Sequence, residues 1–202
     1  MSPLSDKDKI LEYARNHGIF TAREAKKLGI HSQMLTRLVR DGTLERVTRG
    51  QYRVPDQDLT EHFSLTIAAQ AVPSGIICLL SALSFHGIGT QFPAEIWMAI
   101  DRGTRRPGIH FPRLRIVRFS GQAFTTGVET HILEGQPVNI YSIPKTLADL
   151  FKYRNKVGLD VALEALREAW LERRFSMDEL DYYAHICRVQ RVMTPYLEAI
   201  VS

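Results

Sequence analysis

The chain of 202 residues contains little cysteine and no long apolar run. Its two cysteines, Cys78 and Cys187, are far apart and neither forms a CxxC pair, which argues against a zinc motif and a disulfide framework. We expect both to be small buried residues. No apolar stretch reaches the roughly 18 residues of a membrane span, and residues 1–8 carry alternating charges instead of an apolar signal core. These absences predict a cytoplasmic protein without a membrane segment.

The sequence also lacks the short motifs of common enzymes. It has no P-loop, dinucleotide fingerprint, GxSxG elbow or HExxH pair, and no Gly-Ser followed by paired aspartates as in nucleotidyltransferases. Ser81, Ser84 and His86 are close in sequence, but such proximity does not make a catalytic triad. We therefore expect no enzymatic activity, no metal and no cofactor.

Positive charge is concentrated in the first quarter of the chain. Residues 1–55 contain 11 Lys and Arg against 6 Asp and Glu, a balance of +5, whereas residues 56–202 contain 15 against 16, a balance of −1. The surplus predicts a polyanionic partner for the N-terminal segment.

That segment has the local signals of three short helices. Thr21 and Glu24 have capping-box spacing at the start of the second helix, Gly29 ends it, and Ser32 is a suitable N-cap for the third. The predicted helices cover residues 5–16, 22–28 and 32–41.

The third helix has a polar face that fits DNA. Leu35, Leu38 and Val39 have the spacing of a buried stripe. Side chains of the types found on the opposite face hydrogen-bond to base edges in the major groove. The alternative is an ordinary solvated face, which most surface helices have. The candidate DNA-reading residues are Gln33, Thr36, Arg37 and Arg40.

A hairpin over residues 43–55 follows directly. Arg49 and Gly50 form its tip, as a two-residue turn or as part of a three-residue loop with Gly50 at positive φ. Arginines on such a ribbon contact phosphates or the minor groove, and those present are Arg46, Arg49 and Arg53. Three helices followed by this ribbon predict a winged helix-turn-helix DNA-binding domain.

The rest of the chain predicts a second domain. We assign residues 1–55 to the DNA-binding domain, 56–60 to a short linker and 61–202 to the second domain. Strands are predicted at 76–80, 96–100, 114–119, 128–133 and 138–141, with helices after them. A run of strands followed by a run of helices predicts an α+β fold with a mainly antiparallel sheet.

Three segments together resemble the AbiEi family of abortive-infection antitoxins: TRGQYR at 48–53, LSALSFHG at 80–87 and IPKTLADLFKYR at 143–154. The resemblance spans nearly the whole chain and transfers no catalytic residue. It implies an N-terminal winged helix that represses its own operon, with operator DNA as the partner. It also implies a C-terminal domain that counters a co-transcribed nucleotidyltransferase toxin as a type IV antitoxin, without a need for direct toxin binding. We expect the operator to contain inverted repeats upstream of the gene.

Two basic features of the second domain are candidates for an antitoxin or accessory nucleic-acid surface. Six arginines surround a segment that we interpret as a hairpin, and the alternative is a solvated hairpin. The second feature consists of Lys145, Asp149, Lys152 and Arg154, of which Lys145 and Arg154 are the candidates for such a surface. In the simpler alternative Lys145 pairs with Asp149 four residues later, which is worth only ~0.3 kcal/mol on a helix. The six arginines are Arg102, Arg105, Arg106, Arg113, Arg115 and Arg118.

Two other functions remain open. One is a ligand-responsive winged-helix transcription factor, which a closed apolar pocket in the second domain would favour. The other is an interaction adaptor, which a stoichiometric complex with the neighbouring gene product would favour.

Overall fold

A computed structural model describes residues 5–55, 62–109 and 111–201. Its contacts divide the chain into two units, one of Met1–Ala71 with His131–Val138 and one of Val72–Thr130 with Asn139–Ser202. The predicted linker at 56–60 lies outside the described residues. Both units contain helices and strands, so the predicted α+β class is confirmed.

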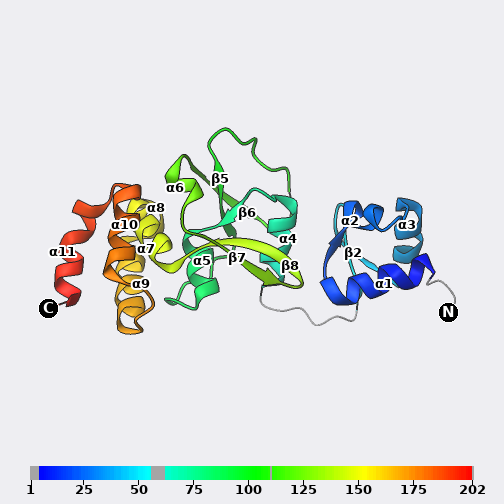
Figure 1. The fold of residues 1–202 in the computed structure, drawn as a ribbon, viewed down its shortest axis with the longest axis horizontal. Coiled ribbons are helices and arrows are strands. Elements are labelled where there is room, and N and C mark those ends of the chain that lie inside the picture. The colour runs from blue at the N-terminus through cyan, green and yellow to red at the C-terminus, as the bar shows by residue number, and fades with distance from the viewer. Residues whose placement is uncertain (1–4, 56–61, 110, 202) are drawn as a thin grey trace. The chain divides into compact units, whose positions relative to one another are not determined.

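The N-terminal unit begins with three short helices and a small antiparallel sheet in the order β1-β3-β2 (Figure 1). Ser32, the expected N-cap of α3, is its first helical residue, and the N-cap is His31. The elements are α1 (Asp6–His17), β1 (Phe20–Thr21), α2 (Ala22–Lys27), α3 (Ser32–Arg40), β2 (Glu45–Thr48) and β3 (Gln51–Arg53).

A small apolar core holds these elements together. Ile10 of α1 and Leu35 and Leu38 of α3 are almost fully buried. The rings of Phe20 and Tyr52 stack with their centroids 5.8 Å apart, which joins β1 to β3. Because α3 points its apolar stripe into this core, its polar face is left for solvent.

Two later segments also belong to the N-terminal unit. They are α4 (Phe63–Ala71) and residues 131–138, where β7 (Val128–Leu133) is followed by β8 (Gln136–Tyr141). The side-chain amides of Gln70 and Gln136 both donate to the carbonyl oxygen of Ile19, each at 3.1 Å. Gln51, which is 4% exposed, donates to the side-chain oxygen of Gln70 at 2.9 Å. These amide hydrogen bonds tie the two segments to Ile19, which lies between α1 and β1, and to Gln51 of β3.

The second sheet is mixed, so the expected mainly antiparallel arrangement is wrong. Its order is β6-β5-β4-β8-β7. β4 runs antiparallel to β5, but β4 with β8 and β5 with β6 are parallel pairs. The 12 residues between β5 and β6 form a crossover, because parallel neighbours need a connection of about this length. The additional strands are β4 (Ile76–Ile77), β5 (Ile96–Asp101) and β6 (Leu114–Phe119).

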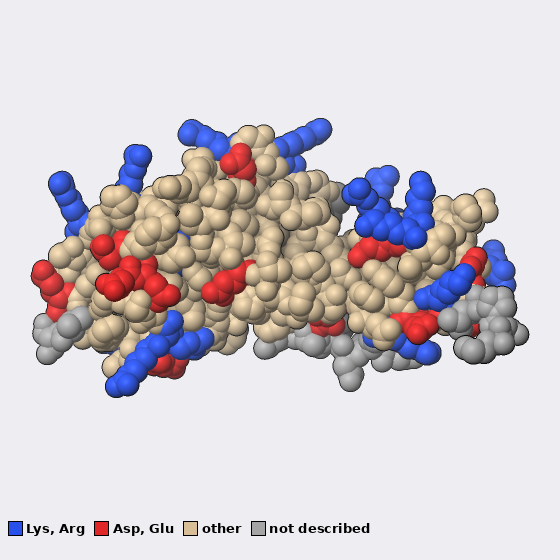
Figure 2. Space-filling view, in the orientation of Figure 1, with Lys and Arg blue, Asp and Glu red and all other residues tan. Residues whose placement is uncertain are grey.

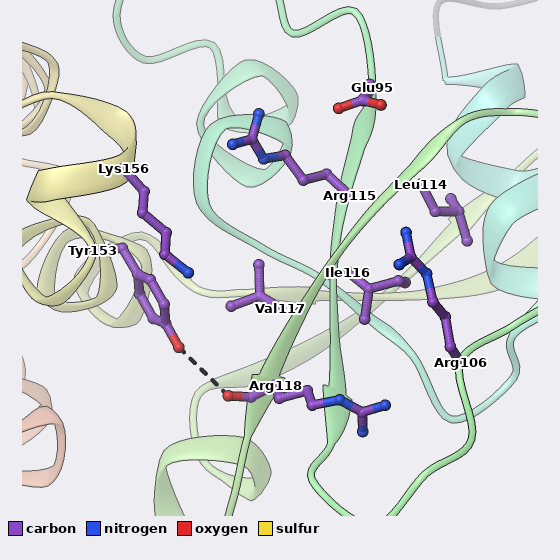
Figure 3. A pocket seen from close by; sticks show the side chains of 9 residues that line it. All are labelled: Glu95, Arg106, Leu114, Arg115, Ile116, Val117, Arg118, Tyr153 and Lys156. Atoms are coloured by element: carbon purple, nitrogen blue, oxygen red, sulfur yellow. Dashed lines mark hydrogen bonds between the residues drawn. The ribbon is translucent and has the colours of Figure 1, made fainter.

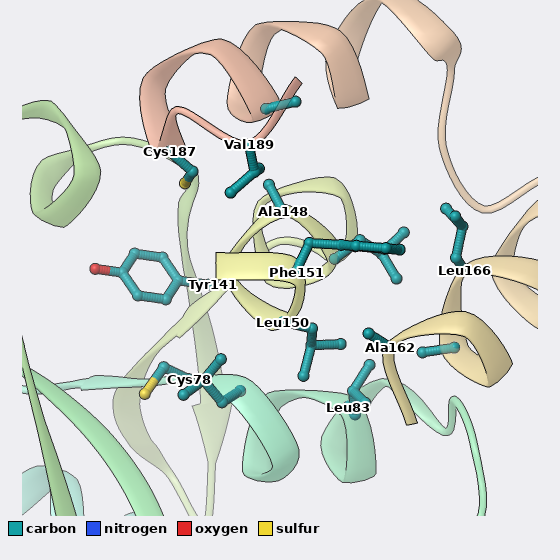
Figure 4. Packing of buried hydrophobic residues seen from close by; sticks show 14 of the residues in the cluster. Cys78, Leu83, Tyr141, Ala148, Leu150, Phe151, Ala162, Leu166, Cys187 and Val189 are labelled. Carbon is teal, nitrogen blue, oxygen red and sulfur yellow. The ribbon is translucent and has the colours of Figure 1, made fainter. Parts of the chain in front are cut away.

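The remaining helices pack around α7, whose residues Pro144–Phe151 are all buried. Figure 4 shows Leu150 and Phe151 of α7 between Leu83, Leu166 and other apolar side chains. The strand expected at 76–80 ends at Ile77, because α5 begins at Leu79; the short helix α6 was not predicted. These helices are α5 (Leu79–His86), α6 (Gln122–Thr125), α7 (Ile143–Lys152), α8 (Arg154–Val157), α9 (Leu159–Leu171), α10 (Met177–Cys187) and α11 (Gln190–Val201). Within the described ranges, none of the helices has both the length and the apolar character needed to cross a bilayer.

Candidate nucleic-acid interface

The structure brings the four predicted residues of the third helix together on one exposed face of α3. Positions 33, 36, 37 and 40 follow i, i+3, i+4 and i+7 spacing, which places their side chains in neighbouring rows. The Thr36 hydroxyl donates to the carbonyl oxygen of Ser32 at 3.1 Å, so its own oxygen remains able to accept. We call this set the reading face: Gln33, Thr36, Arg37 and Arg40.

The turn before α3 fixes the direction of that face. The amide of Ile30 donates to the Ala25 carbonyl and the amide of Gly29 to the Lys26 carbonyl, both at 3.0 Å. This is the Schellman pattern of a helix C-terminus, and Gly29 takes the φ of +81° that it requires. Ile30 is 2% exposed and anchors the turn in the core.

The other end of α2 is fixed by a complete capping box. The Glu24 amide donates to the Thr21 hydroxyl at 3.2 Å, and the Thr21 amide donates to the Glu24 carboxylate at 2.6 Å. The Tyr13 hydroxyl reaches the other carboxylate oxygen at 3.4 Å. The capping box fixes the start of α2 and the Schellman turn fixes its end, so hydrogen bonds between residues close in sequence set the position of α3 after the turn.

The hairpin of β2 and β3, which we call the wing, is connected to the same helix. Thr48 and Gln51 are paired, so the tip is the two-residue turn of Arg49 and Gly50, with Gly50 at a φ of +81°. The Gly50 carbonyl oxygen accepts from the amide of Ala22 at 2.9 Å. Arg46 and Arg49 are exposed. The wing tip is therefore fixed to the start of α2 and presents two arginines.

Arg53, the third predicted arginine of the wing, is paired within the hairpin. Its guanidinium donates to the Glu45 carboxylate at 2.8 and 3.1 Å and lies 5.5 Å from the centroid of the Phe63 ring. Its side chain is only 13% exposed. Register explains the pairing, because Glu45 lies opposite Arg53 across the hairpin. Arg53 thus supports the wing.

The charge of this region is uneven. Figure 2 shows Lys and Arg side chains gathered over the side of the N-terminal unit where α2 and α3 lie. Asp41, at the end of α3, is the carboxylate nearest in sequence to the reading face. Its pKa is lowered chiefly by hydrogen bonds from Thr43, with Arg37 contributing. The Asp41 carboxylate is therefore ionised at neutral pH. The four exposed arginines of the reading face and the wing carry more positive charge than this one carboxylate balances.

The six arginines predicted to surround a hairpin lie instead on a crossover loop and β6 of the C-terminal unit, because β5 and β6 are parallel. Three of them, Arg106, Arg115 and Arg118, line one hollow of about 560 Å³ with Tyr153 and Lys156 (Figure 3). The guanidinium of Arg115 lies 4.4 Å from the centroid of the Trp97 ring. Arg102, Arg105 and Arg113 are exposed but do not line this hollow.

Arg118 also organises the loop. Its Nη1 donates to the carbonyl oxygens of Arg102 and Thr104, both at 2.8 Å. The Tyr153 hydroxyl donates to the Arg118 carbonyl oxygen at 3.4 Å. Burial, and secondarily Asp149, raises the pKa of Tyr153 to about 12, so the phenol is neutral at pH 7.

Lys145 is not part of any surface, and its assignment to one is wrong. It is 0% exposed, forms an ion pair with Asp149, and lies 4.1 Å from the centroid of the Tyr141 ring. The predicted pairing with Asp149 is confirmed, but the pair is buried instead of exposed. The physical reason is the position of α7, which the other helices surround.

Arg154 lines a second hollow of about 780 Å³, and its Nη1 donates to the Phe151 carbonyl oxygen at 2.8 Å. Lys152, Arg118 and Arg188 also line it. Sequence reasoning included Lys152 in the second feature but did not select Lys156 or Arg188. The run of alternating cations from 152 to 156 was a usable signal for Lys156.

An exposed basic helix face beside an arginine-tipped hairpin is typical of nucleic-acid-binding regulators. Residues 8–55, which span these elements, match the family model described as "Transcriptional regulator, AbiEi antitoxin". The resemblance to this family is thereby confirmed for the N-terminal segment.

The fold of a larger part of the chain has a counterpart among solved structures. It is similar to the crystal structure of the RV2827C protein from Mycobacterium tuberculosis, with a TM-score of 0.59 and 13% identity, over 90% of this chain and 72% of that one. At this identity the likeness shows the fold alone. No curated protein matches the chain.

Proposed function

We propose that the N-terminal segment is a winged helix-turn-helix domain that binds operator DNA. The observation that carries this proposal is the exposed reading face on α3, whose direction is fixed by the Schellman turn. The family match at residues 8–55 supports a regulator of this kind. Gln33, Thr36, Arg37 and Arg40 read bases in the major groove, and Arg46 and Arg49 contact the backbone.

The wider function that we propose is a cytoplasmic autorepressor and antitoxin. The protein binds inverted repeats upstream of its own gene, and its C-terminal unit counters a nucleotidyltransferase toxin encoded beside it. No catalytic step by the chain is required. The two hollows that share Arg118 and Tyr153 are lined by cations, so neither of them fits the closed apolar pocket that a metabolite sensor would use. A third hollow, on α9, is lined by Leu163 and Leu171 together with charged side chains.

The test is fluorescence anisotropy of the full-length protein on its upstream DNA and on a scrambled duplex, at several salt concentrations. Arg37→Ala should weaken upstream binding by ~1–3 kcal/mol and reduce the preference over the scrambled duplex. Arg49→Ala should weaken both duplexes alike and lower the salt slope by about 1. A matched control is Arg191→Ala, which removes an exposed cation from α11 and should change neither quantity.

Three outcomes decide the proposal. Preference for upstream DNA that depends on Arg37 supports it. An Arg37→Ala protein that keeps its full preference shows that α3 does not read bases. Absence of any binding at low salt shows that this unit does not bind DNA. Co-expression with an adjacent nucleotidyltransferase gene tests the antitoxin part separately, by survival of the host cells.

A further inference from the structure

Two of the hollows of the C-terminal unit, those lined by arginines of the crossover loop, β6 and α8, adjoin each other. Both are lined by Arg118 and Tyr153, so they adjoin at these two residues. Their volumes are about 560 and 780 Å³. We use the name basic groove for this pair of hollows from here on.

Charge in the groove is almost entirely of one sign. Among the described residues that line it, seven different cations face a single carboxylate, that of Glu95. The cations are Arg106, Arg115, Arg118, Lys152, Arg154, Lys156 and Arg188. Such a concentration of like charge is unfavourable unless a polyanion neutralises it.

Several of these cations are held in place. Arg115 is stacked on Trp97, and Arg154 donates to the Phe151 carbonyl oxygen. Arg118 is tied to the carbonyl oxygens of the crossover loop that carries Arg106. In Figure 3, Lys156 and Tyr153 enter from the helical side, and Arg106 and Arg115 come from the opposite side. Cations held on both walls lose less side-chain entropy when a ligand binds.

We propose that the basic groove is a second nucleic-acid site, which takes the phosphate backbone of a single strand. A concave, cationic channel tracks a flexible strand, as in other proteins that bind single strands without sequence preference. A duplex is read instead by elements that protrude into its grooves, such as α3 in the N-terminal unit. This site is independent of the proposed operator binding, because it uses none of the same residues.

The test uses full-length protein and three labelled probes of about 12 nucleotides: single-stranded RNA, single-stranded DNA of the same sequence, and the corresponding DNA duplex of scrambled sequence. The variant is Lys152→Gln/Lys156→Gln, which removes two exposed charges and leaves polar, unbranched side chains in their place. The control is Arg167→Gln/Arg191→Gln, which makes the same charge change outside the groove. Arg37→Ala serves as a second control for the N-terminal unit.

We expect the single strands to bind with a steep salt dependence. The Lys152→Gln/Lys156→Gln protein should bind them on the order of tenfold more weakly at ~0.1 M salt, with a salt slope lower by about 1.4, because two phosphate contacts are lost. The control and Arg37→Ala proteins should bind them as the wild type does. Preference for RNA would show recognition of the 2′-hydroxyl, and equal binding would show recognition of the backbone alone.

Two results would overturn the proposal. One is equal single-strand binding by the groove variant and its control. The other is a groove-dependent preference for the duplex, which would make the groove an extension of the operator-binding surface. Failure of Arg37→Ala to affect operator binding contradicts only the proposed function, so the two proposals fail separately.

Discussion

The buried ion pair of Lys145 and Asp149 offers the sharpest test of how the C-terminal unit is held together. Both side chains are at most 1% exposed. Lys145 faces the rings of Tyr141 and Phe119, with its Nζ 4.1 and 4.9 Å from their centroids. Asp149 also accepts a hydrogen bond from the Cys187 thiol at 3.1 Å. Each charge therefore depends on the other for most of its compensation.

Removing the negative charge leaves a buried ammonium group. Asp149→Asn keeps the shape of the side chain and an oxygen that can accept from Cys187, so the change is mainly one of charge. Breaking a buried pair costs ~3–5 kcal/mol, and the two aromatic rings compensate part of the loss. We expect the free energy of unfolding to fall by about 3 kcal/mol.

Removing the positive charge of Lys145 should lower the free energy of unfolding by an amount that depends on pH. Burial raises the pKa of Asp149, and Lys145 opposes that rise in the wild type. In Lys145→Met the native carboxyl binds its proton more tightly than the unfolded one, whose pKa is about 3.9. Stability is therefore regained as the pH falls toward 4 and lost as it rises. Neutralising the carboxyl at pH 7 costs at most about 4 kcal/mol, so the loss should approach this value at pH 7 and fall below about 1 kcal/mol at pH 4.

Urea unfolding followed by tryptophan fluorescence measures these losses. The two tryptophans of the chain, Trp97 and Trp170, both lie in the C-terminal unit, so the signal reports that unit. Each variant is compared with the wild type at the same pH, and Lys145→Met/Asp149→Leu should lose less than either single variant. An equal loss for Lys145→Met at pH 4 and pH 7 would refute the reasoning, because it would mean that water already solvates the carboxylate.

Three further predictions concern local features. Gly50→Ala should cost about 1 kcal/mol, because the φ of +81° disfavours any side chain although the space around it is open; thermal unfolding by circular dichroism measures this, and no loss would contradict the wing-tip geometry. Thr21→Ala should cost ~1 kcal/mol through loss of the capping box, whereas Thr21→Ser should lose little. Burial raises the pKa of Cys187 to about 12 and that of Cys78 well above its ordinary value, so neither should react with a disulfide reagent at pH 8 until the protein unfolds. Rapid labelling of the folded protein would show that the cysteines are accessible.

Local features were the most predictable from the sequence. The capping box of Thr21 and Glu24 and the turn at Gly29 depend on residues within six positions of one another, and the structure contains both. The exposure of the reading face followed from the helical period once Leu35 and Leu38 were assigned to the core. Such inferences succeed because the interactions are short in sequence.

Features that depend on distant partners were less predictable. Strands β5 and β6 have apolar residues suited to either direction, and only the length of residues 102–113 favoured a parallel crossover over a hairpin. The apolar residues after Ile77 fit a buried strand or a buried helix equally well, and the structure has the helix α5 there. Spacing predicted the pair of Lys145 and Asp149, but only the packing of the surrounding helices determines its depth.

The hairpin register shows why the ion pair of Arg53 was not predicted from the sequence. With the tip at Arg49 and Gly50, counting outward from the pair of Thr48 and Gln51 places Arg46 opposite Arg53. In the structure the register shifts by one residue between Arg46 and Thr48, and Glu45 lies opposite Arg53 instead. The ion pair of Arg53 with Glu45 therefore depends on this irregularity, which counting along the strands does not predict. The sign of the charge alone does not identify a DNA contact, because a cation such as Arg53 can be paired with a carboxylate on its own sheet.

Hydrogen bonds between residues 1–55 and the later segments of the N-terminal unit affect how DNA binding and antitoxin activity can be tested separately. Removal of residues 1–55 would take away the Ile19 carbonyl oxygen that accepts from Gln70 and Gln136, and the Gln51 amide that donates to Gln70. The truncated protein would keep α4 and residues 131–138 without these partners, so the truncation changes the packing of the remaining chain as well as removing the reading face. Loss of antitoxin activity on truncation could then result from the missing DNA-binding domain or from altered folding of the remaining chain. Charge-removing variants of Arg37 and Lys152 avoid this ambiguity, because both side chains are exposed and neither contributes to a core.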